Sequence, residues 1–189
     1  MTLSLAAGAK VEQALDLSTL AAGVVVEKWG TYAIKQQELE AAANNFIKED
    51  SSAKIVTQKD FPKFLSFLST SSLKVAFTNG CFDVFHAGHA DYLSKAKQLA
   101  DILVVGVNSD ESVKILKGNS RPINCLEDRL KVLSSLSCVD YLVVFSETTP
   151  YHLIKEISPQ VLVKGDDYEK DKIVGAKWVQ DKGGLVETI

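Results

Sequence analysis

Short apolar runs alternate with helical patterns along most of the chain from residue 73 onwards. The apolar runs, which indicate buried strands, cover residues 73–77, 102–107, 141–145, 161–164 and 185–186. Helical patterns, in which apolar residues recur every three or four positions, cover about residues 89–100, 110–117, 126–136, 150–157 and 173–181. Because near-continuous apolar strands separated by helices are typical of a parallel sheet covered on both faces, the pattern predicts a doubly wound α/β domain over residues 73–189.

Two segments precede this domain. Residues 1–48 are rich in alanine and have helical patterns at about 11–28 and 36–47, separated by Gly30 and a short extended piece. These helices have apolar faces but too little chain to bury them, so we expect them to pack on the main domain, on another chain, or on a part that this chain lacks. The second arrangement would give a homo-oligomer through this N-terminal helical appendage. Residues 49–72 are predicted to form a polar linker, an edge strand at 53–57 and a connecting helix that begins near Asp60.

Composition and charge exclude several classes of protein. The chain of 189 residues has a hydrophobic fraction of 46% and a formal net charge of −3, without a basic tract, so nucleic acid is not an expected partner. No apolar run approaches the roughly 18 residues of a membrane span, and the N-terminus lacks the basic region of a signal peptide. Three cysteines that are far apart favour a reducing setting without structural disulfides, and we therefore expect a cytoplasmic protein.

The most informative stretch is residues 78–89, TNGCFDVFHAGH, between the first apolar run and the first helical pattern of the domain. Its two histidines, His86 and His89, are three positions apart, so both lie on one face of the first helical turn. Gly88 removes a side chain between the two imidazoles. Because the free N–H groups and the macrodipole of a helix start favour an anion, this stretch predicts a site that handles phosphate.

Two further loops follow predicted strands, at the edge where parallel sheets bind ligands. They contain Asn108, Ser109 and Asp110 after the second strand, and Lys164, Gly165, Asp166 and Asp167 after the fourth. Together with the histidines, these Lys and Asp side chains indicate a phosphorylated ligand and, with it, Mg²⁺. The chain has no G-x-G-x-x-G dinucleotide fingerprint and no P-loop.

Several side chains of this region admit two interpretations. Asp83 could bond backbone amides in the turn, or it could bind a metal ion or position another group. Lys117, which precedes a glycine and a polar loop, is a better candidate than Lys114 for reaching a phosphate. We interpret Arg129 as a structural ion-pair residue, with a place facing the site as the alternative, and His152 as a structural histidine.

Four motifs, taken in order, resemble those of the cytidylyltransferase-like nucleotidyltransferases with an H-x-G-H motif. They are TNGCFDVFHAGH, VGVNSDESVKILKG, RPINCLEDRLKVLSSLSCVDYLVVF and VLVKGDDY. The resemblance covers about residues 53–189 and is greatest to the adenylyltransferase domains that act on heptose 1-phosphate. In those proteins the domain follows a ribokinase-like sugar kinase, and residues 3–34 resemble its last helices. The kinase's own G-A-G-D motif is not in this chain, so we expect no kinase activity.

The resemblance implies a Rossmann-like nucleotidyltransferase fold and roles for individual residues. The residues predicted to be catalytic are His86, His89 and Lys117. The residues predicted to bind the nucleotide are Thr78, Asn79, Gly80, Cys81, Phe82, Asp83, Gly88, Lys164, Gly165 and Asp166. Mg²⁺ is expected as a cofactor carried by ATP, without strong ligation by the protein, and Asp83 is the one candidate ligand.

The activity that the resemblance implies is transfer of AMP from ATP to D-glycero-β-D-manno-heptose 1-phosphate with release of pyrophosphate, which makes ADP-heptose for the lipopolysaccharide core. The alternative within the family is a cytidylyltransferase that acts on glycerol 3-phosphate or a similar alcohol phosphate. The family usually ends with a Ser-Thr-rich motif that opens a final helix, and this chain stops at Ile189 before such a motif. We therefore expect a C-terminally truncated domain, and the third alternative is a nucleotide-binding but inactive fragment or an assembly module.

Overall fold

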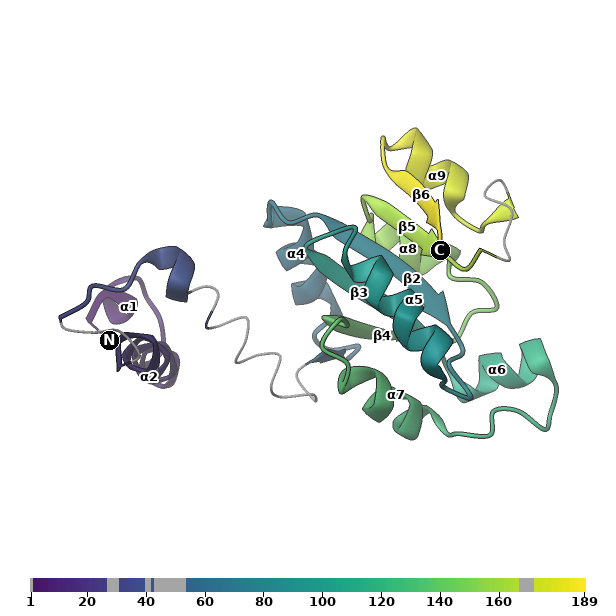
Figure 1. Ribbon diagram of the computed structural model, residues 1–189, viewed down its shortest axis with the longest axis horizontal. Coiled ribbons are helices and arrows are strands. Elements are labelled where there is room, and N and C mark those ends of the chain that lie inside the picture. Colours follow the sequence, from purple (N-terminus) through teal and green to yellow (C-terminus); the bar gives the residue numbers. More distant parts are fainter. Residues whose placement is uncertain (1, 27–30, 40–41, 43–53, 167–171) are drawn as a thin grey trace. The chain divides into compact units, whose positions relative to one another are not determined.

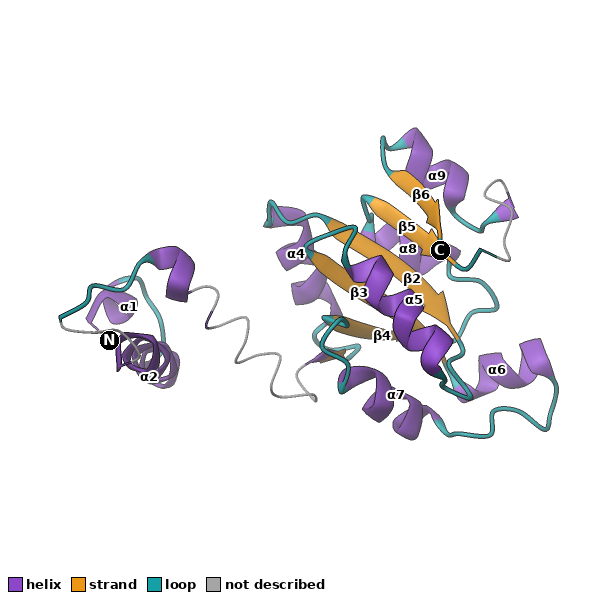
Figure 2. Cartoon of the chain, viewed as in Figure 1, coloured by secondary structure: helices purple, strands orange, loops and turns teal. Residues whose placement is uncertain are grey.

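The structure, a computed structural model, describes residues 2–26, 31–39, 42, 54–166 and 172–189. The chain divides into two compact units, Met1–Asp50 and Ser51–Ile189. Figure 1 labels most of the helices and strands, and Figure 2 colours the chain by type of secondary structure. Within the described ranges, no helix has both the length and the apolar character that a membrane-spanning segment needs.

The described part of the first unit is helical and leaves apolar side chains exposed. It contains α1 (Thr2–Ala6) and α2 (Val11–Val26), and residues 36–39 are also helical. Ala14 is its one described hydrophobic residue that is buried, whereas Val11 and Val26 are 62% and 83% exposed. So short a segment offers too little chain to cover these faces, as expected. Except for residue 42, the remainder of the helix predicted at 36–47 lies outside the described residues, as does the polar linker.

The second unit is built on a sheet of six parallel strands, which confirms the predicted doubly wound α/β fold. The strands are β1 (Ile55–Val56), β2 (Val75–Gly80), β3 (Ile102–Asn108), β4 (Tyr141–Phe145), β5 (Val161–Lys164) and β6 (Leu185–Thr188). Their order across the sheet is β1-β4-β3-β2-β5-β6. The predicted edge strand is therefore present as β1, paired with β4. Together with α4 (Phe61–Thr70), β1 belongs to this unit rather than to a separate connecting segment.

Helices cover both faces of the sheet, and the central strands send alternate side chains to each face. In β2, Val75 and Phe77 join the hydrophobic cluster under α4, α8 (Tyr151–Ile157) and α9 (Ala176–Asp181). Ala76, between them, joins the opposite cluster, under α5 (Ala87–Lys97) and α7 (Leu126–Ser134). Helices α5 and α7 lie on the near face in Figure 1. Because both faces are buried, the strands read as continuous apolar runs instead of alternating ones.

The order of the strands sets the position of the ligand-binding edge. From β2 the chain proceeds through β3 to β4, and it then returns to the other side of β2 to add β5 and β6. This reversal makes a topological switch point between β2 and β5, where the loops that follow the two strands separate. Lys164, at the end of β5, spans this point and donates from Nζ to Oδ1 of Asn79 (2.6 Å) at the end of β2. Helix α6 (Asp110–Lys117) follows β3 at the same edge (Figure 1).

Candidate active site

His86 caps the N-terminus of α5. Its backbone is extended (φ −144°, ψ 172°), and its Nδ1 accepts a hydrogen bond from the backbone N–H of Gly88 at 3.1 Å. An imidazole nitrogen that accepts carries no proton, so the neutral ring of His86 has its proton on Nε2, the nitrogen that remains to donate. The helix begins at Ala87, two residues before the predicted start at residue 89, because the capping residue is the histidine itself.

His89 lies one turn further along α5, with its ring centroid 4.0 Å from that of His86. Phe85 stacks on the His89 ring at 5.5 Å, and Phe82 meets it edge-on at 5.4 Å. Nδ1 of His89 is buried and has no hydrogen-bond partner among the described residues, so Nε2 is the nitrogen that can meet a ligand. Burial lowers the pKa of His89 below its usual 6.5, and the charges of His86 and Lys117 lower it further. The ring is therefore held neutral near pH 7.

Gly88 is required by the contact between the helix start and the His86 ring. A Cβ at this position would lie 3.0 Å from Cε1 and Nδ1 of His86, which is too close for an undisturbed ring. We predict that Gly88→Ala shifts the ring by a few tenths of an ångström and lowers kcat up to about tenfold, because a misplacement of about 1 Å can cost about 100-fold.

Steady-state release of pyrophosphate would measure the effect of Gly88→Ala, with a thermal melt to show that the variant is folded. Gly23→Ala is the matched control, because a Cβ at Gly23 meets nothing within 4 Å. Full activity of Gly88→Ala would contradict the assigned role of the His86 ring.

Asp83 is buried, with 3% of its surface exposed, and it links the stretch 78–89 to the loop that follows α6. Its Oδ1 accepts from the backbone N–H groups of Ile123 (2.7 Å) and Asn124 (3.0 Å), and its Oδ2 pairs with Arg121 (2.5 Å). The side-chain amide of Asn124 (Nδ2) in turn donates to the backbone carbonyl oxygen of Asp83. Both carboxylate oxygens are thus engaged by the protein, as in the interpretation that Asp83 bonds backbone amides, although these amides belong to the loop after α6 and not to its own turn.

Burial alone would raise the pKa of Asp83. The hydrogen bonds from Asn124, Arg121 and Ile123, together with the positive charge of Arg121, outweigh burial and hold the pKa below its usual 3.8. The described residues also contain no cluster of three or more His, Cys, Asp or Glu side chains that could hold a metal ion.

Arg129 is the second buried anchor of the site, with a side chain that is fully buried. It donates to the carbonyl oxygens of Cys81 (2.6 Å) and Asn124 (3.2 Å) and pairs with Asp110 (2.8 Å). One guanidinium group thus joins the loop after β2, the loop before α7 and the start of α6. This arrangement agrees with the interpretation of Arg129 as a structural ion-pair residue.

A cleft of about 670 Å³ opens at this edge, and most of the predicted site residues line it. The predicted residues that line it are Asn79, Gly80, Cys81, Phe82, Asp83, His86, Gly88, His89, Lys117, Lys164 and Gly165. Two predicted residues do not: Thr78 is buried and bonds the Tyr92 hydroxyl at 2.6 Å, and Asp166 is exposed, with its backbone N–H bonded to Ile189. Asp83, the one acidic side chain among the described residues of the lining, is paired with Arg121, so this part of the cleft favours an anion.

The sequence did not single out four residues that also line the cleft, namely Val84, Tyr92, Arg121 and Ile189. Arg121 lies in a polar loop at the start of the third motif, to which the resemblance assigned no role, and Tyr92 belongs to the apolar pattern of its helix, which also predicts a core residue. Neither local pattern carries a signal for a ligand.

A second hollow of about 400 Å³ adjoins the cleft and shares five of its lining residues. The shared residues are Asn79, Gly80, Cys81, Lys117 and Lys164. Thr148, Thr149 and Lys172 line only the second hollow, and the sequence did not single them out.

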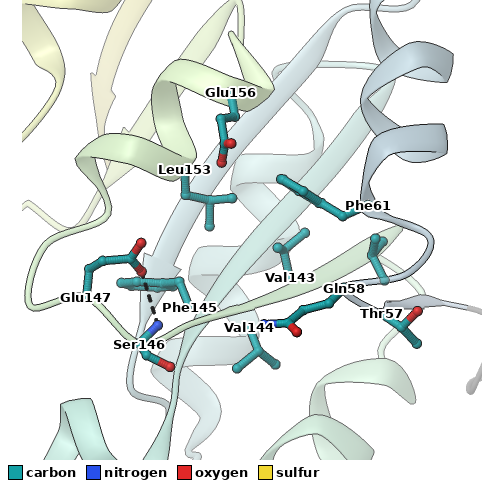
Figure 3. Close-up of a pocket in the computed structure, with 11 residues that line it drawn as sticks. Thr57, Gln58, Phe61, Val143, Val144, Phe145, Ser146, Glu147, Leu153 and Glu156 are labelled. Atoms are coloured by element: carbon teal, nitrogen blue, oxygen red, sulfur yellow. Dashed lines mark hydrogen bonds between the residues drawn. The ribbon is translucent and has the colours of Figure 1, made fainter.

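A third hollow, of about 530 Å³, lies beyond the end of β4 and is shown in Figure 3. Its charged lining residues are Glu147 and Glu156, and Phe61, Val143 and Leu153 supply much of its apolar wall. Glu147 accepts a hydrogen bond from the backbone N–H of Ser146 at 3.2 Å. Two carboxylates without a lining cation would repel a phosphate, so this hollow does not fit the predicted ligand.

Comparison with known proteins gives a family match for the part of the chain that contains the cleft. A family model described as cytidylyltransferase-like matches residues 77–187, from the middle of β2 to β6. A crystal structure of a lipopolysaccharide core biosynthesis protein from Thermoplasma volcanium superposes with a TM-score of 0.51 and 27% identity. That superposition covers 62% of this chain and 98% of the other.

Two curated relatives match the whole length of this chain. Both are named bifunctional protein HldE: the protein from Actinobacillus succinogenes is 46% identical, and the protein from Haemophilus ducreyi is 43% identical. Each match covers all of this chain but 39% of the relative. The chain thus spans about two fifths of the length of these relatives.

Proposed function

Because this chain belongs to the cytidylyltransferase-like family, we propose that its second unit transfers AMP from ATP to D-glycero-β-D-manno-heptose 1-phosphate and releases pyrophosphate. The observation that carries the proposal is the histidine pair of α5, His86 and His89, whose rings lie 4.0 Å apart in an anion-favouring cleft. A helix N-terminus with two imidazole N–H donors matches the needs of a triphosphate.

The reaction needs positioning and charge stabilisation more than proton transfer. A phosphate oxygen of the sugar phosphate is already anionic, so it can attack the α-phosphorus of ATP without a base. The new P–O bond forms as the bond between the α-phosphorus and the oxygen that bridges it to the β-phosphorus breaks, and pyrophosphate leaves. In this proposal His86 and His89 donate from Nε2 to the oxygens on which negative charge develops, and the Lys117 ammonium group stabilises the same charge. The fixed His86 cap and the aromatic contacts of His89 orient both rings before the substrate arrives.

Mg²⁺ enters the proposal as part of the substrate, MgATP, where it would neutralise charge on the phosphate oxygens. Asp83 keeps its role in holding the loop.

The choice of acceptor rests on the order of motifs in the sequence and on the matched relatives. The structural match to a lipopolysaccharide core biosynthesis protein is compatible with a heptose acceptor. Because ATP and sugar phosphates are intracellular metabolites, we propose the cytoplasm as the place of this reaction. The kinase activity expected of a longer bifunctional protein is not part of the proposal for this chain.

Pyrophosphate release with four substrate pairs tests the proposal directly. We expect turnover with MgATP and heptose 1-phosphate, and little or none when CTP replaces ATP or glycerol 3-phosphate replaces the heptose. Turnover with CTP alone would replace the heptose assignment by a cytidylyltransferase. Binding of MgATP in a calorimeter without turnover by any pair would indicate a nucleotide-binding module that is not an enzyme.

A further inference from the structure

The ring of His89 is held differently from the ring of His86. The His86 ring accepts a hydrogen bond from Gly88, whereas Nδ1 of His89 is buried and has no hydrogen-bond partner among the described residues. A histidine that acts on a ligand is usually oriented by a hydrogen bond to its second ring nitrogen. Another kind of contact must therefore set the direction of Nε2 in His89.

Two aromatic rings contact the imidazole of His89. Phe82 meets it edge-on, with the ring centroids 5.4 Å apart and the planes at 64°, and Phe85 stacks on it at 5.5 Å and 24°. Phe82 is the more firmly held of the two, because it is 6% exposed and belongs to the hydrophobic cluster under α5 and α7, whereas Phe85 is half-buried beside that cluster. Since edge-to-face rings have a preferred geometry, a fixed Phe82 ring limits the rotation of the imidazole.

The direction of the Phe82 ring is set by an unusual backbone conformation. Phe82 has a φ of +48°, in the left-handed region that residues with a side chain rarely adopt. Such a conformation persists only where the surrounding structure holds it, and it is found most often at functional sites. Gly80 provides the space for the ring, because a Cβ at this position would lie 3.1 Å from Cε2 and 3.2 Å from Cζ of Phe82. The Phe82 ring thus lies next to both Gly80 and His89.

We propose, on the basis of the function proposed above, that Phe82 is the positioning residue of His89. Its ring holds the imidazole with Nε2 toward the cleft, which is the role that a hydrogen bond has at most functional histidines. The apolar ring also shields the imidazole from water, and this favours the neutral form of His89. Phe82 would thus act on the phosphates through His89 and not by contacting the nucleotide.

The kinetics of Phe82→Leu test this role, with a thermal melt to show that the variant is folded. We expect kcat for pyrophosphate release to fall about tenfold and KM for ATP to stay within about twofold, because a displaced donor stabilises the transition state less. In the His89→Ala background the same substitution should cost nothing further, because the group that Phe82 positions is absent. Phe67→Leu is the matched control and should keep wild-type kcat, because the Phe67 ring contacts Tyr141 (6.2 Å) and lines none of the three hollows.

Gly80→Ala displaces the Phe82 ring without removing either ring, and it decides the question if Phe82→Leu does not fold. The added Cβ would move the Phe82 ring by a few tenths of an ångström, so we expect kcat to fall about threefold. Together with Phe82→Leu it should cost nothing more, because leucine lacks the two ring atoms nearest to that Cβ. An equal loss of kcat from Gly80→Ala with and without the Phe82 ring would overturn the inference.

The NMR signals of His89 supply a readout that does not need turnover. The chain has three histidines, so each imidazole can be followed through a pH titration. Burial lowers the pKa of His89 below its usual 6.5, and the charges of His86 and Lys117, which remain in Phe82→Leu, lower it further. Because loss of the Phe82 ring reduces this burial, the pKa of His89 should rise toward 6.5 in the variant, while the signals of the exposed His152 should not change.

The two measurements distinguish a failure of this inference from a failure of the proposed function. If the wild-type chain shows no turnover but the pKa of His89 rises in Phe82→Leu, the positioning of the ring stands and the proposed function fails. If neither turnover nor a change in pKa is seen, both fail. When the wild-type chain turns over, a lower kcat with a raised pKa of His89 supports the inference. Full kcat in Phe82→Leu, a lower kcat with unchanged His89 signals, or a rise in KM for ATP in place of a lower kcat would each overturn it.

Discussion

His86→Ala and His89→Ala are each expected to lower kcat for pyrophosphate release by about 10²–10³, the usual effect of removing one donor that stabilises transition-state charge. Each ring presents one nitrogen to the cleft, since Nδ1 of His86 is bonded to Gly88 and Nδ1 of His89 is buried. The two losses should not add in the double variant, because the rings lie 4.0 Å apart and act on the same phosphates.

His152→Ala is the matched control for both histidine variants, because His152 is exposed on α8 and lines none of the three hollows. It should retain wild-type kcat. Loss of the His86 cap also costs about 1 kcal/mol of helix stability, so a thermal melt must accompany the kinetics. A His86→Ala variant that melts normally and keeps full kcat would disprove the mechanism proposed for this residue.

Asp83→Ala is expected to reduce the free energy of unfolding by about 2–4 kcal/mol, because it strands two backbone N–H groups and leaves Arg121 without its partner. The same change releases the loop that presents Arg121 to the cleft, so KM for ATP should rise as well. Urea denaturation measures the first effect and steady-state kinetics the second. Asp181→Ala, at an exposed position in α9, is the control and should leave both quantities unchanged.

The stabilisation by Asp83 should depend on pH in one direction. Since its pKa is lower in the folded chain than the usual 3.8, the unfolded chain binds the proton more tightly. The contribution is therefore complete above the unfolded pKa and is lost as the pH falls through the lower, folded value. Below pH 4 the wild-type chain should lose stability relative to the Asp83→Asn variant, so the gap between their urea midpoints should close. A gap that stays constant down to pH 2 would contradict the assigned cause.

The helices and strands of the α/β unit could be predicted because the burial of each element is visible in its local sequence, as a helical repeat of apolar residues or as a continuous apolar run. β3, buried at every position, gives an unbroken apolar run, and such a run is readable without knowledge of the fold. The start of α5 was placed two residues late because its cap is a histidine, whereas the side chains that usually mark a helix start are Ser, Thr, Asp and Asn. α9 begins at Ala176, after a glycine at positive φ, rather than at residue 173.

The site was predictable only where its residues are neighbours in sequence. The stretch 78–89 was found for this reason, but the pairing of Asp83 with Arg121 joins positions 38 residues apart, and no local pattern encodes it. Thr78 follows the alternation of β2 into the layer of α5, where it meets Tyr92, while Asn79 remains at the cleft. The second hollow draws on three separate loops, so its threonines and Lys172 gave no motif.

The capping role of His86 has a consequence for how this site is built and maintained. The ring of a functional histidine is commonly oriented by a hydrogen bond to a carboxylate or carbonyl group from another part of the sequence, and the tertiary structure must hold that group in place. Here the aiming group is the amide of Gly88, two residues away, in the helix that the histidine itself begins. The group that orients the ring thus belongs to the first turn of α5 itself, so this hydrogen bond needs no partner from a distant part of the chain.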